Sequence, residues 1–366
     1  MNSVSELNTK RLLALTKAAL YTTIPDESLF VNTSEADWNE IFELSAAQGV
    51  MVLSFIGAMR LPEALYPPLA LKLRWIASVD TVEKRYRHVS EAAESLSDYF
   101  QAHNIRMLLF KGLSLSRLYP VPASREFGDI DIFLCGKAKE GDVLLERIVD
   151  KKSISSKKHV NYSYRGILIE NHHTFLNHGG DTFFHCSQQL EKHITTLATA
   201  SVPVNENLLF PSPEFNVLHA TLHMLVHLQR RIVLRHLCDL AVLFKAYKGT
   251  IDFVQYRNTL SEADLLKPAD ALISLSIRYL GLNPEDAPPY QSDRLLEDRL
   301  WNDLLNPEVS LPPDEKRSLL NVFIYKIRLI RSNRWKYELM FPGKFWRKIL
   351  YSSFLHILHP GTIGRL

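Results

Sequence analysis

Two aspartates separated by one apolar residue form the pattern in this sequence that most directly suggests chemistry. They occur in the run Asp129-Ile130-Asp131-Ile132, in which charged and apolar side chains alternate as they do along a strand. Both carboxylates would therefore share one face of a sheet, where they repel each other unless a cation lies between them. Oxygen ligands suit Mg²⁺ or Mn²⁺, so the pair predicts a divalent metal site. A solvated strand edge is the alternative, because Asp-x-Asp is common.

The residues that precede this pair are of types that bind phosphate. Lys111 and Gly112 form a turn between an apolar run and a short helical segment, and Ser114 lies close behind them. A glycine allows the backbone to approach a phosphate, and a lysine neutralises its charge. Arg125 lies in the loop before the aspartates, where two uses are open: contact with a triphosphate, or an ion pair with an acidic neighbour.

A third carboxylate is expected at Glu170. Two short alternating runs separated by Arg165-Gly166 predict a β-hairpin, and Glu170 lies near the end of the second run. That strand has the right length to pair beside the two aspartates, which makes Glu170 the candidate for a third metal ligand. An exposed glutamate at a strand end is the alternative. His172 follows two residues later on the same face and is a candidate site residue.

The order of these motifs resembles the nucleotidyltransferase superfamily of the DNA polymerase beta type. The resemblance is strongest to its uncharacterised bacterial branch, in which Lys-Gly opens the motif and the acidic strand reads Asp-Ile-Asp. It extends to Glu170-Asn171-His172 and to the helices between His219 and Asp239, so it covers residues 90–245. One departure is Gly112-Leu113, where the wider superfamily has two small residues. The matching residues are Lys111, Gly112, Leu115, Tyr119, Arg125, Asp129, Ile130 and Asp131.

This resemblance implies a metal-dependent enzyme that transfers a nucleotidyl group from an NTP to an acceptor and releases pyrophosphate. In such a reaction charge builds on the phosphoryl oxygens, and metal ions held by carboxylates stabilise it. The resemblance makes Asp129, Asp131 and Glu170 the catalytic metal ligands, with Mg²⁺ or Mn²⁺ as cofactor. The residues expected to bind nucleotide or substrate are Lys111, Gly112, Ser114, Arg125, His172, His223 and Asp239.

The acceptor and the efficiency of the reaction stay open. A small molecule, a sugar, a peptide or a protein would each serve as acceptor, because the sequence contains no specificity code; nucleic acid is not expected. The irregular turn at Gly112-Leu113 motivates an alternative of a different class. This is a nucleotide-binding or scaffold protein that retains a degenerate nucleotidyltransferase fold without efficient transfer. Association with a membrane surface would suit such a role.

Three histidines at intervals of four residues, His219, His223 and His227, fall on one stripe of a predicted helix. Such a stripe suggests a metal site, but it lacks the glutamate of the His-Glu-x-x-His motif, and the helix is otherwise apolar. We therefore favour histidines of the core or of a substrate cleft, hydrogen-bonded to Asp239.

The segments around these motifs predict an α+β protein with a small mixed sheet flanked by helices. We divide it into an N-terminal helical region (1–90), a nucleotidyltransferase-like α/β core (91–205), a helical domain (206–315) and basic, aromatic C-terminal helices (316–366). Apolar residues at steps of three and four predict one long helix over 71–103, closed by Asn104. Further helices are expected at 46–59, 113–118, 142–149, 265–280, 295–305 and 318–331, N-caps at Thr33 or Ser34 and at Ser212, and strands at 105–110, 129–134 and in a hairpin at 160–170.

The composition is that of a globular protein whose positive charge is concentrated at one end. Of the 366 residues, enough for two or three subdomains, 46% are hydrophobic and 23% are charged. Residues 316–366 contain eleven lysines and arginines and one glutamate, a net charge of +10, so the total of +3 leaves −7 for residues 1–315. Cys135, Cys186 and Cys238 are widely spaced and odd in number, which fits the reduced thiols of a cytoplasmic protein. We recognise no signal peptide and no transmembrane run.

The basic end of the chain also carries seven aromatic residues between 316 and 350. Three uses are open for such a segment: helices that solvate an acidic body, a helix on an anionic membrane surface, or nucleic-acid contact. We favour them in that order. Residues 344–358 have the pattern of an interfacial helix, whereas the acidic remainder of the chain argues against nucleic acid.

Overall fold

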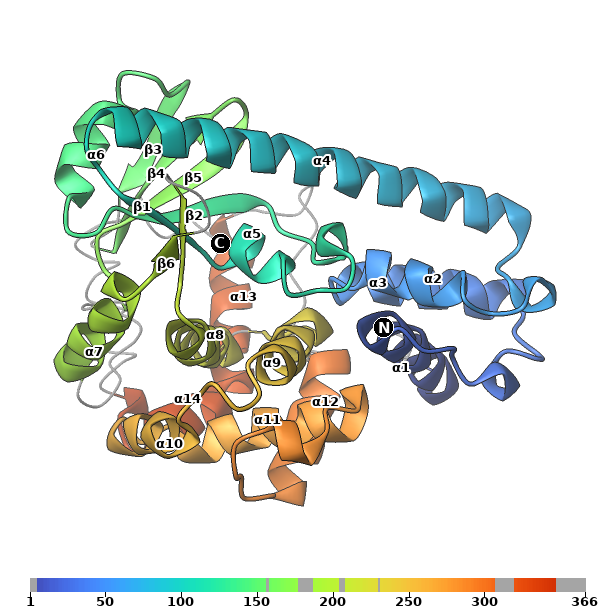
Figure 1. Ribbon diagram of the computed structural model, residues 1–366. Coiled ribbons are helices and arrows are strands. Elements are labelled where there is room, and N and C mark those ends of the chain that lie inside the picture. The colour runs from blue at the N-terminus through green and yellow to red at the C-terminus, as the bar shows by residue number, and fades with distance from the viewer. Residues whose placement is uncertain are drawn as a thin grey trace.

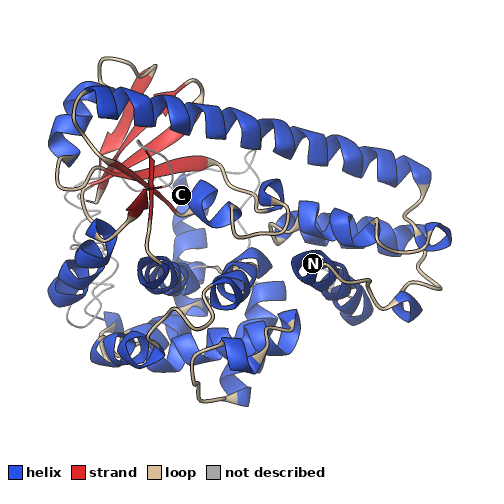
Figure 2. Ribbon diagram, in the orientation of Figure 1, coloured by secondary structure: helices blue, strands red, loops and turns tan. Residues whose placement is uncertain are grey.

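A mixed sheet surrounded by helices forms the described part of the molecule. The computed structural model describes residues 5–155, 158–176, 187–203, 208–229, 231–306 and 319–346. The strands gather in one part of the molecule and helices make up the rest (Figure 2). The α+β fold class predicted from the sequence is confirmed.

The sheet has seven strands in the order β3-β4-β5-β2-β1-β7-β6. The pairs β2–β5 and β1–β7 are parallel, and the other neighbours are antiparallel. The predicted strands correspond to β1, β2, β4 and β5. The sheet is larger than expected by β3 at one edge and by β7 and β6 at the other. The bounds are β1 Met107–Phe110, β2 Asp129–Phe133, β3 Lys151–Ser155, β4 His159–Tyr164, β5 Ile167–His172, β6 Val202–Pro203 and β7 Leu208–Phe210.

The β4–β5 hairpin forms where the sequence predicts it. Arg165 and Gly166 adopt φ angles of 52° and 72°, the positive values that a two-residue loop of this kind requires at both positions. The register that follows pairs His159 with His172 at the open end of the hairpin. Strand β5 thereby carries Glu170 and His172 alongside β2.

Helices cover both faces of the sheet and extend well beyond it (Figure 1). Helix α4 crosses above the sheet and continues over α2 and α3, while α8 and α9 lie on the opposite side. No helix in the described ranges combines the length and hydrophobicity that a membrane crossing needs. The bounds are α1 Glu6–Tyr21, α2 Glu35–Ala47, α3 Met51–Ala58, α4 Leu69–Ala102, α5 Gly112–Ser116, α6 Ala138–Leu145, α7 Ser187–Thr199, α8 Pro213–Leu228, α9 Leu234–Ala246, α10 Phe253–Glu262, α11 Leu266–Leu280, α12 Arg294–Leu305, α13 Leu319–Ser332 and α14 Arg334–Met340.

The prediction of one helix over 46–59 is wrong, because the chain breaks between α2 and α3. Gly49 adopts a φ of 65°, a left-handed value that interrupts a helix. Helix α3 then begins at Met51. Its first turn is capped by a side chain that is distant in the sequence. The Glu126 carboxylate accepts hydrogen bonds from the backbone N–H of Met51 at 3.0 Å and of Val52 at 3.4 Å. This long-range cap has no local sequence signal.

Two other helix ends also differ from the prediction. Helix α4 is capped by His103, and the expected cap Asn104 follows in the left-handed region at a φ of 56°. Helix α6 begins earlier than the predicted 142–149. Asp142 lies inside it rather than at its start, and its carboxylate accepts a hydrogen bond of 2.9 Å from Tyr162 of the sheet.

The predicted N-caps are confirmed. Of the two candidates before α2, Ser34 forms the cap, in a reciprocal capping box with Asp37. Ser212 caps α8 by accepting a hydrogen bond of 3.2 Å from the backbone N–H of Phe215. Local turn chemistry therefore determines both helix starts.

Two predictions concern residues that lie partly outside the described ranges. Cys135 and Cys238 are free thiols, as expected, whereas Cys186 lies outside. The expected interfacial helix over 344–358 lies outside from residue 347 onward.

The sheet separates two apolar cores. Along β1, Leu108 and Phe110 face one core, while Met107 and Leu109 face the other, as strand alternation requires. The second core lies against α4, and the first continues into the N-terminal helices and through α8–α12. The N-terminal and the later helices therefore share one core, and the boundaries at 90, 205 and 315 stay predictions.

Gln48, which follows α2, ties the N-terminal helices to the later ones. Its side chain is 1% exposed. Its Oε1 accepts a hydrogen bond from the Leu234 N–H at 2.9 Å, and its Nε2 donates to the Leu304 carbonyl at 3.1 Å. One buried amide therefore satisfies the first turn of α9 and the last turn of α12.

We predict that Gln48→Ala lowers the free energy of unfolding by about 1–3 kcal/mol for each buried backbone group left without its partner. Urea denaturation followed by circular dichroism measures this change. The matched control is Gln101→Ala on α4, whose side chain is exposed and whose loss should cost less than about 0.5 kcal/mol. Equal costs for the two substitutions would contradict the prediction.

Candidate functional site

Three of the predicted site residues meet on one face of the sheet. In the parallel pairing of β2 with β5, Asp131 lies opposite Glu170, so the two side chains project from the same face. Asp129 lies two residues before Asp131 and shares that face. The structure thus brings together the three carboxylates expected from the sequence.

Positive and hydrogen-bonding groups converge on the buried carboxylate of Asp131, which is 2% exposed. The Lys111 ammonium donates to its Oδ1 at 2.5 Å and lies 3.9 Å from Glu170 Oε2. His172 Nε2 lies 2.8 Å from the same Oδ1 and 3.3 Å from Glu170 Oε2. Burial by itself would raise the pKa of Asp131, but Lys111 and the hydrogen bond with His172 hold that pKa well below its usual range.

Asp129 has the opposite electrostatic environment. Burial first, and then the negative charge of Asp131, raise the pKa of Asp129 to about 6, although the Lys111 charge opposes the shift. Asp129 is therefore the carboxylate of the three whose charge is least compensated by its surroundings. It becomes fully ionised only at neutral pH and above.

Gly112 and Ser114 lie in the short helix α5, and the structure gives a packing reason for the glycine. A Cβ at Gly112 would come within 3.1–3.2 Å of the Phe127 side chain, closer than side chains ordinarily pack. Ser114 is buried. The ammonium of Lys111, expected beside phosphate, lies among the carboxylates. Phosphate binding by this turn stays a prediction.

Arg125 forms an ion pair with Asp239 rather than with either of its acidic neighbours. Its Nε donates to Asp239 Oδ1 at 2.9 Å and its Nη2 donates to Oδ2 at 2.8 Å. The Tyr119 hydroxyl donates to Oδ1 at 2.7 Å. Burial opposes the charge on Asp239, but Arg125 keeps the pKa of Asp239 below its usual range. This fork joins α9 to the loop before β2.

The same loop is also held by arginines of α4 and α9. Arg85 of α4 donates to the Gly128 carbonyl at 2.7 Å, and Arg235 of α9 donates to the Glu126 carbonyl. The Glu126 side chain, as described above, caps α3. Three helices therefore fix the backbone that leads into Asp129.

His159 and Lys158 also lie beside the carboxylates, and sequence reasoning missed both. His159 Nδ1 lies 3.7 Å from Glu170 Oε2. Burial, and then the Lys111 charge, lower the pKa of Lys158 to about 8. A signal for His159 was present, because a two-residue loop at Arg165-Gly166 sets a register that pairs residue 159 with residue 172.

The histidines of α8 are core and partly buried residues, as favoured from the sequence, but they lack the expected partner. Asp239 accepts from Arg125 and Tyr119 instead. His219 stacks on Phe215 with ring centroids 5.2 Å apart, and the Nε2 atoms of His223 and His227 lie 3.3 Å apart. Burial and the Lys111 charge lower the pKa of His223 well below its usual value.

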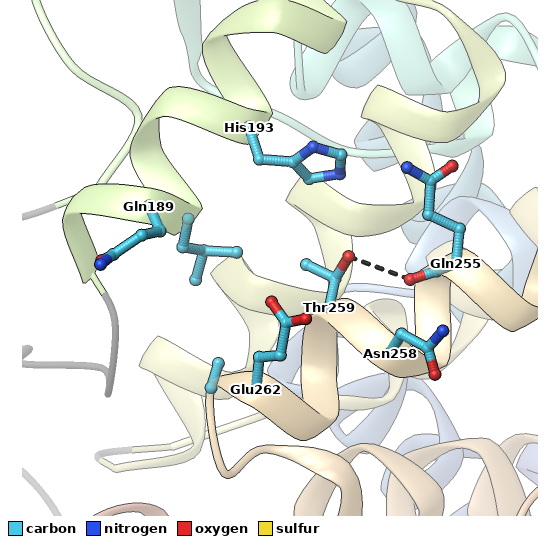
Figure 3. Close-up of a pocket in the computed structure, with 8 residues that line it drawn as sticks. Gln189, His193, Gln255, Asn258, Thr259 and Glu262 are labelled. Atoms are coloured by element: carbon cyan, nitrogen blue, oxygen red, sulfur yellow. Dashed lines mark hydrogen bonds between the residues drawn. The ribbon is translucent and has the colours of Figure 1, made fainter.

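A polar cavity of about 340 Å³ lies away from these residues, between α7 and α10. Figure 3 shows His193 of α7 opposite Gln255 and Thr259 of α10. None of the carboxylates on the sheet lines this cavity, so it is separate from the candidate site.

Comparisons with known proteins identify a family for this chain. A family model described as "Uncharacterised nucleotidyltransferase" matches residues 34–281, the greater part of the chain. No curated protein matches. Among solved structures the chain is similar to an antigenic nucleotidyltransferase-like protein from Paracoccidioides brasiliensis, with 16% identity over 49% of this chain and 90% of that chain, and a TM-score of 0.29. A TM-score this low carries no argument about the site.

We predict that Asp129→Asn stabilises the protein at pH 7 in a buffer containing EDTA. Because the folded state raises the pKa of Asp129 to about 6, stability falls as the pH rises from about 4 to about 6. The amide removes that cost, so the gain should reach at most about 3 kcal/mol at pH 7 and vanish below about pH 4.

Thermal unfolding between pH 4 and 8 measures this difference. The matched control is Glu91→Gln, at an exposed position on α4, which should show no pH-dependent gain. A stabilisation by Asp129→Asn that is equal at all pH values would refute the prediction.

We predict that Asp239→Asn lowers the free energy of unfolding by about 3–5 kcal/mol, because it leaves the buried Arg125 charge without its partner. The control is Glu43→Gln, which removes an exposed ion pair with Arg74 and should cost less than about 1 kcal/mol. Urea titration compares the two variants. Similar losses would show that the Arg125–Asp239 pair is no more important than a surface pair.

Proposed function

We propose that this chain, which belongs to the uncharacterised nucleotidyltransferase family, transfers a nucleotidyl group from an NTP to an acceptor and releases pyrophosphate. The observation that carries the proposal is the register of β2 and β5, which sets Asp131 opposite Glu170 with Asp129 on the same face. Three carboxylates on one face are the arrangement that metal-dependent transfer requires.

The residues present fit a divalent cation. Asp129, Asp131 and Glu170 offer oxygen ligands, which suit Mg²⁺ or Mn²⁺. Burial first, and repulsion from Asp131 second, raise the pKa of Asp129, and a bound cation would offset both effects. Lys111 would compete with the cation for the Oδ1 of Asp131, from which its ammonium lies 2.5 Å.

The reaction would use these side chains as follows. An acceptor oxygen bonds to the α-phosphorus as the bond to the bridging oxygen breaks, and pyrophosphate leaves with that oxygen. Glu170 would orient the acceptor and take its proton, while Lys111 and Lys158 would neutralise phosphate oxygens. A bound divalent cation would supply further neutralisation of the triphosphate.

The acceptor class stays open among small molecules, sugars, peptides and proteins. The net charge of −7 on residues 1–315 argues against nucleic acid.

The free thiols Cys135 and Cys238 support a reducing, cytoplasmic compartment. Peripheral membrane contact through residues 316–366 is a further proposal, which co-sedimentation of the full chain with anionic vesicles tests.

A second candidate function is favoured by two of the contacts described above. Lys111 is engaged by Asp131, and Arg125 is engaged by Asp239, so neither cation is free of a carboxylate partner. A nucleotide-binding or scaffold protein with a degenerate site would have such contacts. NTP affinity without turnover across a broad acceptor screen would support this alternative.

We predict that Asp131→Asn lowers nucleotidyl transfer more than about 100-fold, since even the outer partners of metal ligands contribute up to that factor. Incubation with α-labelled NTPs, Mg²⁺ or Mn²⁺ and a mixture of acceptors measures product formation. Glu91→Gln is the control and should retain full activity. Transfer that survives Asp131→Asn would refute the assignment of the site.

We also predict that transfer by the wild-type protein declines as the pH falls through about 6, because Asp129 must ionise to bind a cation and its pKa is about 6. A pH–rate profile at a metal concentration well below saturation checks this, because a bound cation would itself lower the pKa of Asp129. A rate that is constant from pH 5 to pH 8 would exclude Asp129 as an essential ionised group.

A further inference from the structure

The imidazoles of His159 and His172 lie on one side of the carboxylate cluster and offer nitrogen ligands there. The hairpin register pairs His159 with His172, and their ring centroids lie 5.0 Å apart. One ligand atom each from His159, Glu170 and His172 lies within 4.8 Å of the other two. In the part of the chain that the structure describes, neither Asp129 nor Asp131 belongs to this group.

The spacing within this triad is close to that around a metal ion. Glu170 Oε2 lies 3.3 Å from His172 Nε2 and 3.7 Å from His159 Nδ1. Two ligands of a tetrahedral ion, each about 2.0–2.1 Å from it, lie about 3.3 Å apart. Small side-chain rotations would therefore bring all three ligand atoms to coordination distance.

The orientation of His172 also suits a ligand. Its Nδ1 faces the Thr174 carbonyl at 3.4 Å, while its Nε2 points to Glu170 and Asp131. Orientation of one ring nitrogen by a backbone carbonyl, with the other directed at the ion, is the usual arrangement of metal-bound histidines.

We propose that His159, Glu170 and His172 bind a first-row transition-metal dication in preference to Mg²⁺. Imidazole nitrogen suits transition metals, whereas Mg²⁺ takes oxygen ligands and dehydrates reluctantly. The inference rests on the proposed function in one respect, since its ligand set shares Glu170 with the proposed metal site and names the class of cation bound there.

The burial of the three residues defines which side of such an ion is open. The His172 side chain is 0% exposed, and those of Glu170 and His159 are 16% and 23% exposed. The ion would be held from within by His172 and would keep positions for water or phosphate oxygen on the His159 side. Lys111 can stay paired with Asp131 meanwhile, since its ammonium lies 3.9 Å from Glu170.

Mn²⁺ is the probe for the test, because electron spin echo modulation detects nitrogen bound to this ion. With the full-length protein and no nucleotide, we expect ¹⁴N modulation from bound Mn²⁺. His159→Gln should weaken Mn²⁺ binding at least about 10-fold and leave the weaker binding of Mg²⁺ unchanged. His103→Gln, at an exposed position that ends α4, is the matched control and should alter neither.

Absence of ¹⁴N modulation in the wild-type protein would overturn the proposal. This measurement uses the wild-type protein alone, so it does not depend on whether a variant folds. An Mn²⁺ affinity that is unchanged in His159→Gln would also overturn it. So would a wild-type protein that binds Mg²⁺ as tightly as Mn²⁺. The proposed function and this inference can be contradicted by different results. Nitrogen-bound Mn²⁺ without any transfer would contradict that function alone, whereas transfer without nitrogen coordination would contradict this inference alone.

Discussion

The burial of the Asp131 carboxylate is the constraint on which the rest of the structure depends. A carboxylate that is 2% exposed is tolerated only beside compensating charge and hydrogen-bond donors. The strand order places β1 on one side of β2 and β5 on the other. Lys111 follows β1 and His172 ends β5, so each neighbouring strand delivers one of the groups that contact Asp131. This arrangement keeps three carboxylates together on one face of the sheet.

The helices determine how the chain enters that face. Arginines of α4 and α9 donate to carbonyls of the loop before β2, and the Glu126 carboxylate of the same loop caps α3. The Arg125–Asp239 pair adds a buried connection to α9. The site is therefore built by helices that precede and follow the sheet strands in the sequence as well as by the sheet, and all of them lie within the family match over residues 34–281.

Sequence reasoning located the carboxylates but misjudged several of their neighbours. Alternation along β2 and the hairpin loop before β5 were sufficient to place Asp129, Asp131 and Glu170 on one face. The same hairpin register implies His159, because the loop at Arg165-Gly166 sets residue 159 opposite residue 172. Lys111 was expected beside phosphate, and in the structure its ammonium donates to Asp131 Oδ1, because a buried carboxylate needs a compensating charge.

The sequence by itself determined the long helices, the strands β1, β2, β4 and β5, and the shared face of Asp129 and Asp131, because alternation, capping and turn chemistry act over a few residues. Only the tertiary structure decided the pairing of Arg125 with Asp239 and of Glu126 with the start of α3, which are contacts between distant segments. The periodicity of the sequence does not predict such contacts, since they arise from the packing of helices on a shared core. Buried charges then take whichever opposite charge or hydrogen-bond donor that packing brings within reach.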